Sequence, residues 1–399
     1  MSDYTMRPLR PDETRAAADL FRVALHVPPV KDEDWPYAER MYQPGRTLGA
    51  FDTELIGTAR SFDAELTVPG GRRVPFAAVT GVGVRSDRTR RGVLSQLMRT
   101  QLADAAERGF PLAALYASEG PIYGRFGYGI ATRALNHRID PRRAVLRPEV
   151  PSGGEVELLS GDAALERLPE VYAALPHYRP GMMTRPVHWW AGFERHWRRA
   201  ETPLAAIVHN GPDGPDGFAT YSVQRQSWRD PSTMDVTNLY AASDEAFAGL
   251  WRYLLSVDLV DTIQAEDRPL DEPTSLLFTD PRVCEVTAVT DDLWLRLADV
   301  PAALAARTYE GEPVVLEVTD PVLEGNSGRY RVGPDGVERT SDPAELRLGV
   351  DALAMLYFGG WPASALVAAG RVQVAEASAV TRAEGLFATR PSAWCGTHF

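Results

Sequence analysis

The sequence predicts an α+β protein built from more than one domain, and three observations lead to this prediction. At 399 residues, the chain is long for one domain and suits two or three. Apolar, β-branched runs alternate with amphipathic helical patterns between residues 79 and 129. The same strand–helix order recurs between residues 151 and 290, and a different pattern begins at residue 291.

The first elements come before this central stretch. Residues 11–27 predict a helix, because acidic residues lie near its start and apolar residues follow at helical spacing. Residues 47–59 and 60–68 alternate well enough to predict two strands. A Pro-Gly-Gly-Arg turn at residues 69–72 then leads to a strand that ends at Val84.

The stretch from residue 79 to residue 129 has the clearest pattern in the chain. It opens with Val-Thr-Gly-Val-Gly-Val at residues 79–84, an apolar run suited to a buried strand. A polar turn containing Arg90-Arg91-Gly92 follows, and then a helix whose apolar face consists of Val93, Leu94, Leu97, Met98, Leu102 and Ala105. Gly109 suits the end of this helix, and residues 112–117 predict a strand covered on both faces.

This order of elements favours the binding of an anion. The start of a helix exposes unpaired backbone N–H groups and the positive end of the helix dipole. Arg90 and Arg91 add full positive charges, and Gly92 allows a diphosphate to approach the backbone closely. Taken alone, the same tripeptide is equally consistent with a solvated basic turn before an ordinary amphipathic helix.

The residues that follow favour the first interpretation. Ser-Glu-Gly-Pro-Ile-Tyr-Gly-Arg-Phe-Gly-Tyr-Gly at residues 118–129 resembles the acetyl-CoA-dependent N-acetyltransferase superfamily (GNAT). More narrowly, it is similar to the enhanced intracellular survival (Eis) family of actinobacterial multi-acetylating enzymes. Two residues depart from the superfamily pattern: Leu94 replaces a small residue, which the narrower family tolerates, and Thr89 replaces Arg or Gln, which we expect to weaken the grip on the diphosphate slightly.

The resemblance implies acetyl-CoA as the cosubstrate and a role for each matching residue. Tyr123 would be the general acid, although a buried structural aromatic is the alternative, and the terminal carboxylate of Phe399 would be the general base. The residues expected to bind acetyl-CoA are Val82, Gly83, Val84, Arg90, Arg91, Gly92, Val93, Leu94, Ser95, Ser118 and Glu119.

The acceptor pocket is expected in the acidic, proline-rich segment after the first helix. The aromatic ring of Trp35 and the carboxylate of Asp32 would suit a polyamine. The alternative is a solvated charge run with one packed Trp. His398 also belongs to the expected acceptor site, and it stands where the family pattern has an acidic residue.

The resemblance divides the chain into three parts: a GNAT domain at residues 1–147, a degenerate GNAT-like domain at 148–290 and a sterol-carrier-like α+β domain at 291–399. In the second part, the link before the helix at residues 244–255 has acid and neither an arginine pair nor a glycine. We therefore expect no coenzyme A there. The strand at residues 293–297 is expected to open the third part, whose apolar residues are interpreted as core.

Composition narrows the partners and the location. A net charge of −12 argues against nucleic acid and would suit a cationic acceptor. No apolar run is long enough to cross a membrane, and the N-terminal residues lack the pattern of a signal peptide. Two distant cysteines indicate free thiols in a reducing cytoplasm, and the seven histidines show no metal spacing, so no metal is expected.

The resemblance implies a broad small-molecule amine acceptor, such as an aminoglycoside or a lysine-containing peptide. One alternative is a dedicated acetyltransferase for a single metabolite or peptide, and another is a catalytically silent coenzyme A or lipid sensor. The family forms homohexamers as trimers of dimers, and we expect the same assembly here.

Overall fold

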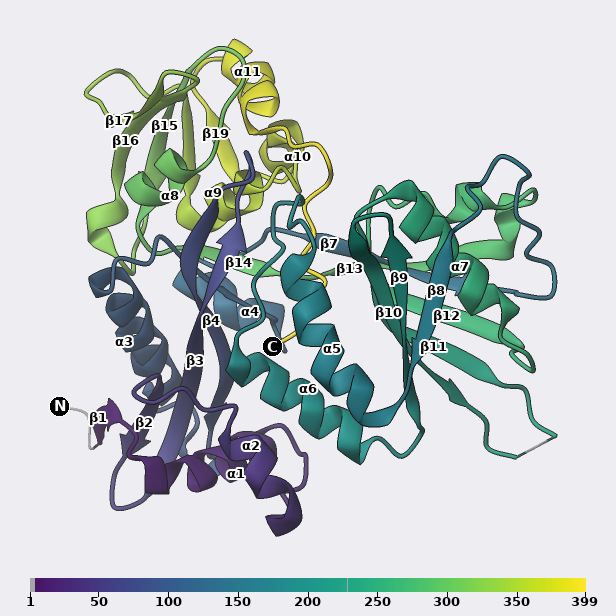
Figure 1. Cartoon of the computed structure of the whole chain (residues 1–399). Coiled ribbons are helices and arrows are strands. Elements are labelled where there is room, and N and C mark those ends of the chain that lie inside the picture. The colour runs from purple at the N-terminus through teal and green to yellow at the C-terminus, as the bar shows by residue number, and fades with distance from the viewer. Residues whose placement is uncertain (1–3, 228) are drawn as a thin grey trace. The chain divides into compact units, whose positions relative to one another are not determined.

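The computed structural model describes residues 4–227 and 229–399, which form two compact units (Figure 1). The first unit contains residues 4–132, 178–192 and 292–399, and the second contains the remaining described residues. Helix α6 (Val187–Arg199) starts in the first unit and ends in the second. Each unit is described separately below.

The first unit contains a seven-stranded mixed sheet. Its strands are, in spatial order, β1 (Thr5–Pro8), β2 (Thr47–Phe51), β3 (Leu55–Thr67), β4 (Arg73–Val84), β5 (Leu112–Leu115), β14 (Trp294–Leu297) and β6 (Gly129–Ile130). All four residues of β5 are buried, as the apolar run predicts. Strands β4 and β5 are parallel, whereas β2, β3 and β4 form antiparallel pairs.

Two helices cover opposite faces of this sheet. Helix α1 (Thr14–Ala24) packs where Gly83 leaves room for the backbone of Phe21. Helix α3 (Val93–Glu107) packs where Gly57 leaves room for Val93. Gly57 of β3 pairs with Val84 of β4, so these two residues face the same side of the sheet. Gly83 precedes Val84, and neighbouring residues in a strand face opposite sides, so Gly83 and Gly57 face opposite sides.

The short helices near the ends of these strands are α2 (Trp35–Glu39) and α4 (Gly120–Tyr123). The apolar face expected for the helix after Gly92 is confirmed for all but Leu94, which is only partly buried.

The prediction that one strand ends at Ala59 and the next begins at Arg60 is wrong. Strand β2 ends at Phe51, and β3 runs without a break through both residues. The turn lies at residues 52–54, where the Asp52 carboxylate accepts hydrogen bonds from the backbone N–H groups of Thr53 and Glu54. This turn contains neither glycine nor proline, so the stronger sequence signals for a turn are absent.

The second unit is also built on a seven-stranded sheet. Its strands are, in spatial order, β13 (Cys284–Asp291), β7 (Arg133–Ile139), β12 (Thr262–Pro269), β11 (Thr233–Ala241), β10 (Gly214–Gln224), β9 (Leu204–Gly211) and β8 (Glu155–Leu159). Helices α5 (Gly161–Ala174) and α7 (Asp244–Ser256) pack on it. Strands β9 and β10 form a hairpin whose pairing extends to Gly211 and Gly214, so only residues 212 and 213 form the turn.

The two large sheets take strands from beyond the expected domain boundaries. Strand β7 precedes residue 147 but pairs with β12 and β13. Strand β14 follows residue 290 but pairs with β5 and β6, so the expectation that it opens the C-terminal fold is corrected. The boundaries at 147 and 290 otherwise stay a prediction.

The C-terminal fold of the first unit has its own five-stranded sheet. The strands are β17 (Gly336–Arg339), β16 (Gly328–Gly333), β15 (Val314–Thr319), β18 (Leu346–Gly349) and β19 (Val372–Val374). The helices are α8 (Val300–Ala306), α9 (Val350–Tyr357), α10 (Ala363–Ala368) and α11 (Ser378–Phe387).

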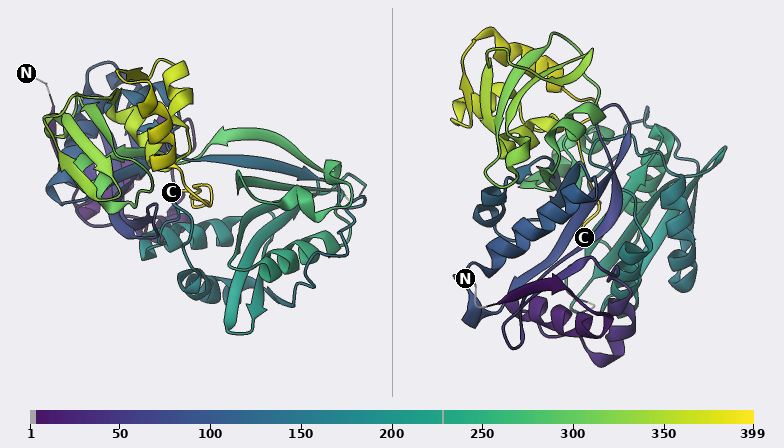
Figure 2. Two further views of the ribbon diagram at one scale, coloured as in Figure 1. Left: turned by 90° about the horizontal axis from the view of Figure 1, so that it is seen from above. Right: turned by 90° about the vertical axis from the view of Figure 1, so that its left-hand side faces the viewer.

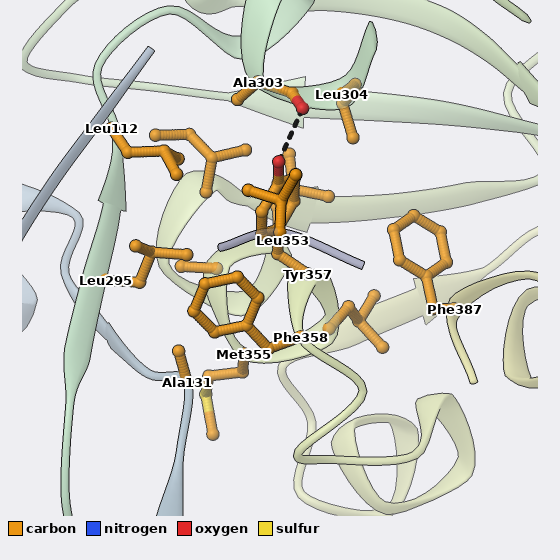
Figure 3. Packing of buried hydrophobic residues seen from close by; sticks show 14 of the residues in the cluster. Leu112, Ala131, Leu295, Ala303, Leu304, Leu353, Met355, Tyr357, Phe358 and Phe387 are labelled. Carbon is orange, nitrogen blue, oxygen red and sulfur yellow. Dashed lines mark hydrogen bonds between the residues drawn. The ribbon is translucent and has the colours of Figure 1, made fainter. Parts of the chain in front are cut away.

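One hydrophobic core joins this fold to the seven-stranded sheet of the first unit. Leu112 of β5 and Leu295 of β14 belong to the same buried cluster as Leu353 and Phe358 (Figure 3). The Tyr357 hydroxyl donates a hydrogen bond of 2.7 Å to the Ala303 carbonyl oxygen inside this cluster. The interpretation of the C-terminal apolar residues as core is therefore confirmed, since seven of the eight residues of α9 are buried.

A buried ion pair lies at the same junction. Arg296 of β14 and Asp320, which follows β15, are 2.6 Å apart, and both side chains are fully buried. Arg296 also donates hydrogen bonds of 2.7 Å to the carbonyl oxygens of Phe126 and Leu297. Because Phe126 follows Tyr123 closely, the ion pair fixes the backbone beside the expected catalytic tyrosine.

We predict that Arg296→Met lowers the free energy of unfolding by about 3–5 kcal/mol, because it leaves the Asp320 carboxylate buried without its cation. Arg138→Met is the matched control, since the Arg138–Glu285 pair is more than half exposed and should cost no more than about 1 kcal/mol. Urea unfolding followed by circular dichroism measures both variants. Equal losses in the two variants would contradict the prediction.

Candidate active site

Strands β4 and β5 separate after a short parallel contact. Their pairing runs only from Phe76 opposite Leu112 to Ala78 opposite Ala114. Strand β5 ends one residue later, whereas β4 continues to Val84 with β3 as its partner on the other side. The backbone of residues 82–84 is therefore not paired with β5 and can bind an extended ligand.

A β-bulge marks the point at which β4 leaves β5. The register with β3 passes from Thr80 opposite Arg60 to Gly83 opposite Thr58, so two residues of β4 face Ala59 alone. The first of these, Gly81, has φ +58°, the left-handed conformation that a glycine adopts without steric cost. The bulge increases the twist of β4 and directs its end away from the sheet.

The turn before α3 has the backbone geometry that suits an anion. Arg90 and Gly92 both have left-handed backbone conformations, with φ of 61° and 81°, and Arg91 lies between them. Such alternation points successive N–H groups to one side. Gly92 is the N-cap of α3 and no side chain caps the helix, so its first N–H groups can bind a ligand.

The arginines of this turn fall into two groups. Arg85 pairs with Glu54 and Asp87, at 2.6 and 3.0 Å, and Arg88 pairs with Asp52 and Asp87, both at 2.9 Å. Arg90 and Arg91 are exposed, and no carboxylate of the described residues pairs with either. Their charges are therefore available to an incoming anion.

The remaining turn residues expected to hold the cosubstrate have structural side chains. Val93 is buried beneath β3, Leu94 packs at the edge of a neighbouring core cluster, and Ser95 is partly buried. Only the backbone N–H groups of these three residues are placed to donate hydrogen bonds to a ligand. Thr89 donates a 3.1 Å hydrogen bond to the Ser86 carbonyl oxygen, so its hydroxyl stabilises the turn.

Tyr123 ends α4 and is almost completely buried. Burial raises the pKa of its phenol above 10, and the nearby Glu119 carboxylate acts in the same direction, whereas a hydrogen bond with Ser118 lowers it. Tyr123 therefore keeps its proton at neutral pH. The Tyr128 ring packs edge-on against it at 6.2 Å between centroids.

The C-terminal residue lies among aromatic side chains of the first sheet. The Phe399 ring makes edge contacts with Phe62 of β3, Phe76 of β4 and Tyr116, at 5.6, 6.2 and 5.2 Å between centroids. Figure 2 shows the C-terminal segment leaving α11 and ending beside β3 and β4. No cation of the described residues forms an ion pair with the Phe399 carboxylate.

Tyr116 holds the residues just before Phe399. Its hydroxyl donates a 3.0 Å hydrogen bond to the Thr397 carbonyl oxygen, and its ring stacks on His398 at 4.0 Å. Because Tyr116 follows β5 directly, it attaches the C-terminal segment at the point where β4 and β5 separate.

The segment 178–192 holds the same residues from the other side. Arg185 donates hydrogen bonds to Thr397 and to the Gly396 carbonyl oxygen, at 3.2 and 3.4 Å. The Trp189 indole N–H donates a 2.6 Å hydrogen bond to the His398 carbonyl oxygen. Trp189 therefore helps to fix the C-terminus.

The three expected acceptor residues are not brought together by any described contact. The Asp32 carboxylate is 99% exposed and pairs with Arg15 at 2.9 Å. The Trp35 ring already has the Arg15 guanidinium 5.1 Å from its centroid and Tyr42 at 6.3 Å, as the packed-Trp alternative predicts. Only His398 lies beside Tyr116 and Phe399.

Sequence reasoning missed the residues that position the C-terminus, namely Phe62, Tyr116, Arg185 and Trp189. Of these four, only Tyr116 gave a signal in the sequence, because it is an aromatic residue directly after a predicted strand. The other three become neighbours through the fold.

Two features are absent from the described residues. No group of three or more His, Cys, Asp or Glu side chains there could hold a metal ion. No helix within those residues is long and apolar enough to cross a membrane. Both cysteines are buried free thiols, and burial raises the pKa of each to about 12.

The corresponding N-terminus of α7 in the second unit is closed. The Ser243 hydroxyl accepts a 3.0 Å hydrogen bond from the Ala246 N–H, and the Glu245 carboxylate accepts one of 2.7 Å from the Gly153 N–H. Hydrogen bonds from Ser152 and the Gly153 backbone lower the pKa of Glu245. A negative charge therefore already occupies this helix end.

Comparisons with known proteins agree with this architecture. Residues 5–131 and 181–297 match family models described as acetyltransferase (GNAT) domains, and residues 300–396 match a sterol carrier protein domain. The chain is 36% identical over 417 residues to an "uncharacterized N-acetyltransferase" of Streptomyces avermitilis, covering 100% of this chain and 99% of the relative. It is 34% identical over 351 residues to the N-acetyltransferase Eis of Mycobacterium tuberculosis, covering 84% of each.

Solved structures give the same result. The crystal structure of Eis1 from Mycobacterium abscessus matches with a TM-score of 0.91 and 40% identity, covering 99% of this chain and 100% of that one. The fold is therefore two GNAT domains followed by a sterol-carrier-like domain, and the protein is an acetyltransferase. The chain belongs to the Eis family of GNAT N-acetyltransferases.

Proposed function

We propose that the protein transfers the acetyl group of acetyl-CoA to a primary amine of an aminoglycoside-like or lysine-containing acceptor. The observation that carries this proposal is the uncapped N-terminus of α3, with two arginines that form no described ion pair, next to the part of β4 that is not paired with β5.

The residues present fit acetyl-CoA. The diphosphate would be held by the N–H groups of residues 93–95 and by the charges of Arg90 and Arg91. The pantetheine arm would run along the free side of β4 at residues 82–84, with the thioester carbonyl oxygen accepting a hydrogen bond from the backbone. Ser118 and Glu119 would line the end of this path, beside Tyr123.

The acceptor amine must lose a proton before it can attack, because aliphatic ammonium groups are mostly protonated at neutral pH. The Phe399 carboxylate would orient the ammonium and pass this proton to water. Its reference pKa of about 3.3–3.7 makes a carboxylate a weak base, so positioning contributes more than basicity. The hydrogen bonds that hold residues 396–398 support this role, since they restrict where the carboxylate can lie.

The transfer then proceeds by attack of the neutral amine on the thioester carbon. The nitrogen lone pair forms the N–C bond, the nitrogen releases its second proton to water, and collapse of the tetrahedral intermediate breaks the C–S bond. Tyr123 would give its phenolic proton to the departing sulfur, so that the products are the N-acetyl acceptor and neutral coenzyme A thiol. The proton that the nitrogen released to water would then restore the phenol of Tyr123, which, with a reference pKa of about 10 against about 8.5 for a thiol, is the weaker acid of the two.

The assembly and the location remain proposals. The Eis resemblance supports a homohexamer built as a trimer of dimers, and the two free thiols fit a reducing cytoplasm.

We predict that the wild-type enzyme releases free thiol from acetyl-CoA in the presence of kanamycin or Nα-acetyl-lysine. Tyr123→Phe should lower kcat by about 100-fold, within the usual contribution of a general acid. Since burial raises the pKa of Tyr123, the wild-type rate should not fall on the alkaline side until the pH exceeds 10. A thiol-detecting assay over a pH series measures these quantities.

Tyr128→Phe is the control for this experiment, because Tyr128 is buried next to Tyr123 and its hydroxyl has no described hydrogen-bond partner. It should retain kcat within about twofold. Full turnover by Tyr123→Phe would refute the acid role, and acetyl-CoA binding without thiol release by the wild type with either amine would refute the proposed acceptor class.

We further predict that deletion of Phe399 lowers kcat by about 100-fold, since the terminal carboxylate then moves one residue back to His398. Phe399→Ala keeps a carboxylate at position 399 and removes only the ring, so it should lose less. The same thiol assay compares the two variants. The base role is wrong if the deletion and the alanine variant have equal kcat, or if the deletion is fully active.

A further inference from the structure

The structure has a partly buried arginine, Arg60, on the sheet face that holds the C-terminus. Arg60 and Phe62 are two residues apart in β3, so their side chains point to the same face. Phe62 contacts the Phe399 ring on that face. Thr58 lies on the same face of β3 as Arg60 and pairs with Gly83, and Gly83 faces α1. Arg60 therefore lies on the α1 side of the sheet, opposite α3.

The neighbours of Arg60 connect it to the C-terminus by a second route. Its guanidinium donates a 3.3 Å hydrogen bond to the Met41 carbonyl oxygen. Met41 packs against Gly192 of α6, where a Cβ would lie 3.0 Å from the methionine methyl group. Helix α6 also carries Trp189, which binds the His398 carbonyl oxygen. Arg60 is thus linked through Met41 to the helix that binds His398, and through β3 to Phe62, which contacts the Phe399 ring.

The space beside Arg60 depends on the β-bulge. A Cβ at Gly81 would lie 3.2 Å from the Arg60 Cβ and 3.5 Å from its Nε. The Arg60 guanidinium instead lies over the Tyr42 ring, 4.8 Å from the centroid. The bulge that separates β4 from β5 therefore also makes room for this side chain.

Arg60 has no anionic partner among the described residues. Its hydrogen bond to Met41 uses a neutral acceptor, and its buried Nε has no hydrogen-bond partner. Burial lowers the pKa of the guanidinium, and only the Tyr42 phenol opposes this effect. Arg46, by contrast, is buried with carboxylates from Asp63 and Asp104. A partly buried cation with a buried, unsatisfied Nε and no anion beside it is costly, which favours a site that receives a negative group from a ligand.

We propose that Arg60 is a specificity-determining residue that binds a carboxylate of the acceptor. This inference rests on the proposed N-acetyltransferase function and narrows its acceptor class. The acceptor is an amine that also carries a carboxylate, such as an amino acid or the C-terminal residue of a peptide. The planar guanidinium matches a carboxylate with two parallel hydrogen bonds.

The same charge disfavours polycationic acceptors. An aminoglycoside brings several ammonium groups into the site, and one placed near Arg60 would be repelled while leaving the guanidinium unpaired. Lysine-containing acceptors with a free carboxylate are therefore favoured over aminoglycosides.

The test uses two probes that differ only in charge at one end, Nα-acetyl-lysine and Nα-acetyl-lysinamide. Isothermal titration calorimetry of the full chain with coenzyme A present measures the dissociation constant of each. We expect the wild type to bind the carboxylate form about 10-fold more tightly, a typical contribution of a charged hydrogen bond. In Arg60→Met the two constants should agree within about twofold.

Two further variants act as controls. Arg99→Met removes an exposed arginine on α3, the helix on the opposite face, and should keep the wild-type preference. Arg60→Lys keeps the charge without the planar fork, so its preference should fall between those of the wild type and Arg60→Met. If Arg60→Met fails to give a folded circular dichroism spectrum, Arg60→Lys decides alone.

The proposal is overturned if the wild type binds both probes equally or neither, or if Arg60→Met keeps the wild-type preference. Thiol release from acetyl-CoA separates this failure from failure of the proposed function. If the wild type and Arg60→Met both acetylate Nα-acetyl-lysinamide or kanamycin as fast as Nα-acetyl-lysine, the protein is still an acetyltransferase. Its specificity then does not depend on Arg60.

Discussion

The parallel contact between β4 and β5 spans only residues 76–78 and 112–114, and the active site depends on the separation that follows. A longer contact would pair the backbone of residues 82–84 and leave no edge for a ligand. The bulge at Gly81 lies three residues after Ala78, the last residue of β4 that pairs with β5, and adds twist to the end of the strand. The exposed turn before α3 then lies at the end of the same strand, so an anion-binding helix end and an unpaired strand edge are neighbours.

The C-terminus reaches this separation because three distant parts of the chain hold it. Tyr116 follows β5, the segment 178–192 belongs to the first unit although residues of the second unit flank it, and β14 brings the C-terminal fold onto the first sheet. The buried Arg296–Asp320 pair and the shared core join that fold to the sheet. Deep burial at this junction gives the terminal residues a fixed support, whereas most chain ends fray.

Local signals in the sequence predicted the strand, turn and helix around the proposed cosubstrate site well, whereas the arrangement around the C-terminus depends on long-range contacts. The run from Val79 to Gly92 encodes a strand, a turn and a helix start through neighbouring residues, and each was found where expected. The turn at Asp52 escaped because a side-chain carboxylate, without glycine or proline, forms it. The apolar run containing Leu295 indicated a buried strand, but its sheet depends on long-range pairing. The acceptor role expected for Trp35 stays a prediction, and the Arg15 guanidinium lies 5.1 Å from the centroid of its ring.

The central claim is that the helix end at Gly92 and the free edge of β4 together bind acetyl-CoA. A crystal structure of the protein with coenzyme A tests it most directly. The account predicts the diphosphate within hydrogen-bonding distance of the N–H groups of residues 93–95, with the pantetheine arm alongside residues 82–84. Coenzyme A bound elsewhere, with the α3 N-terminus empty, would contradict it.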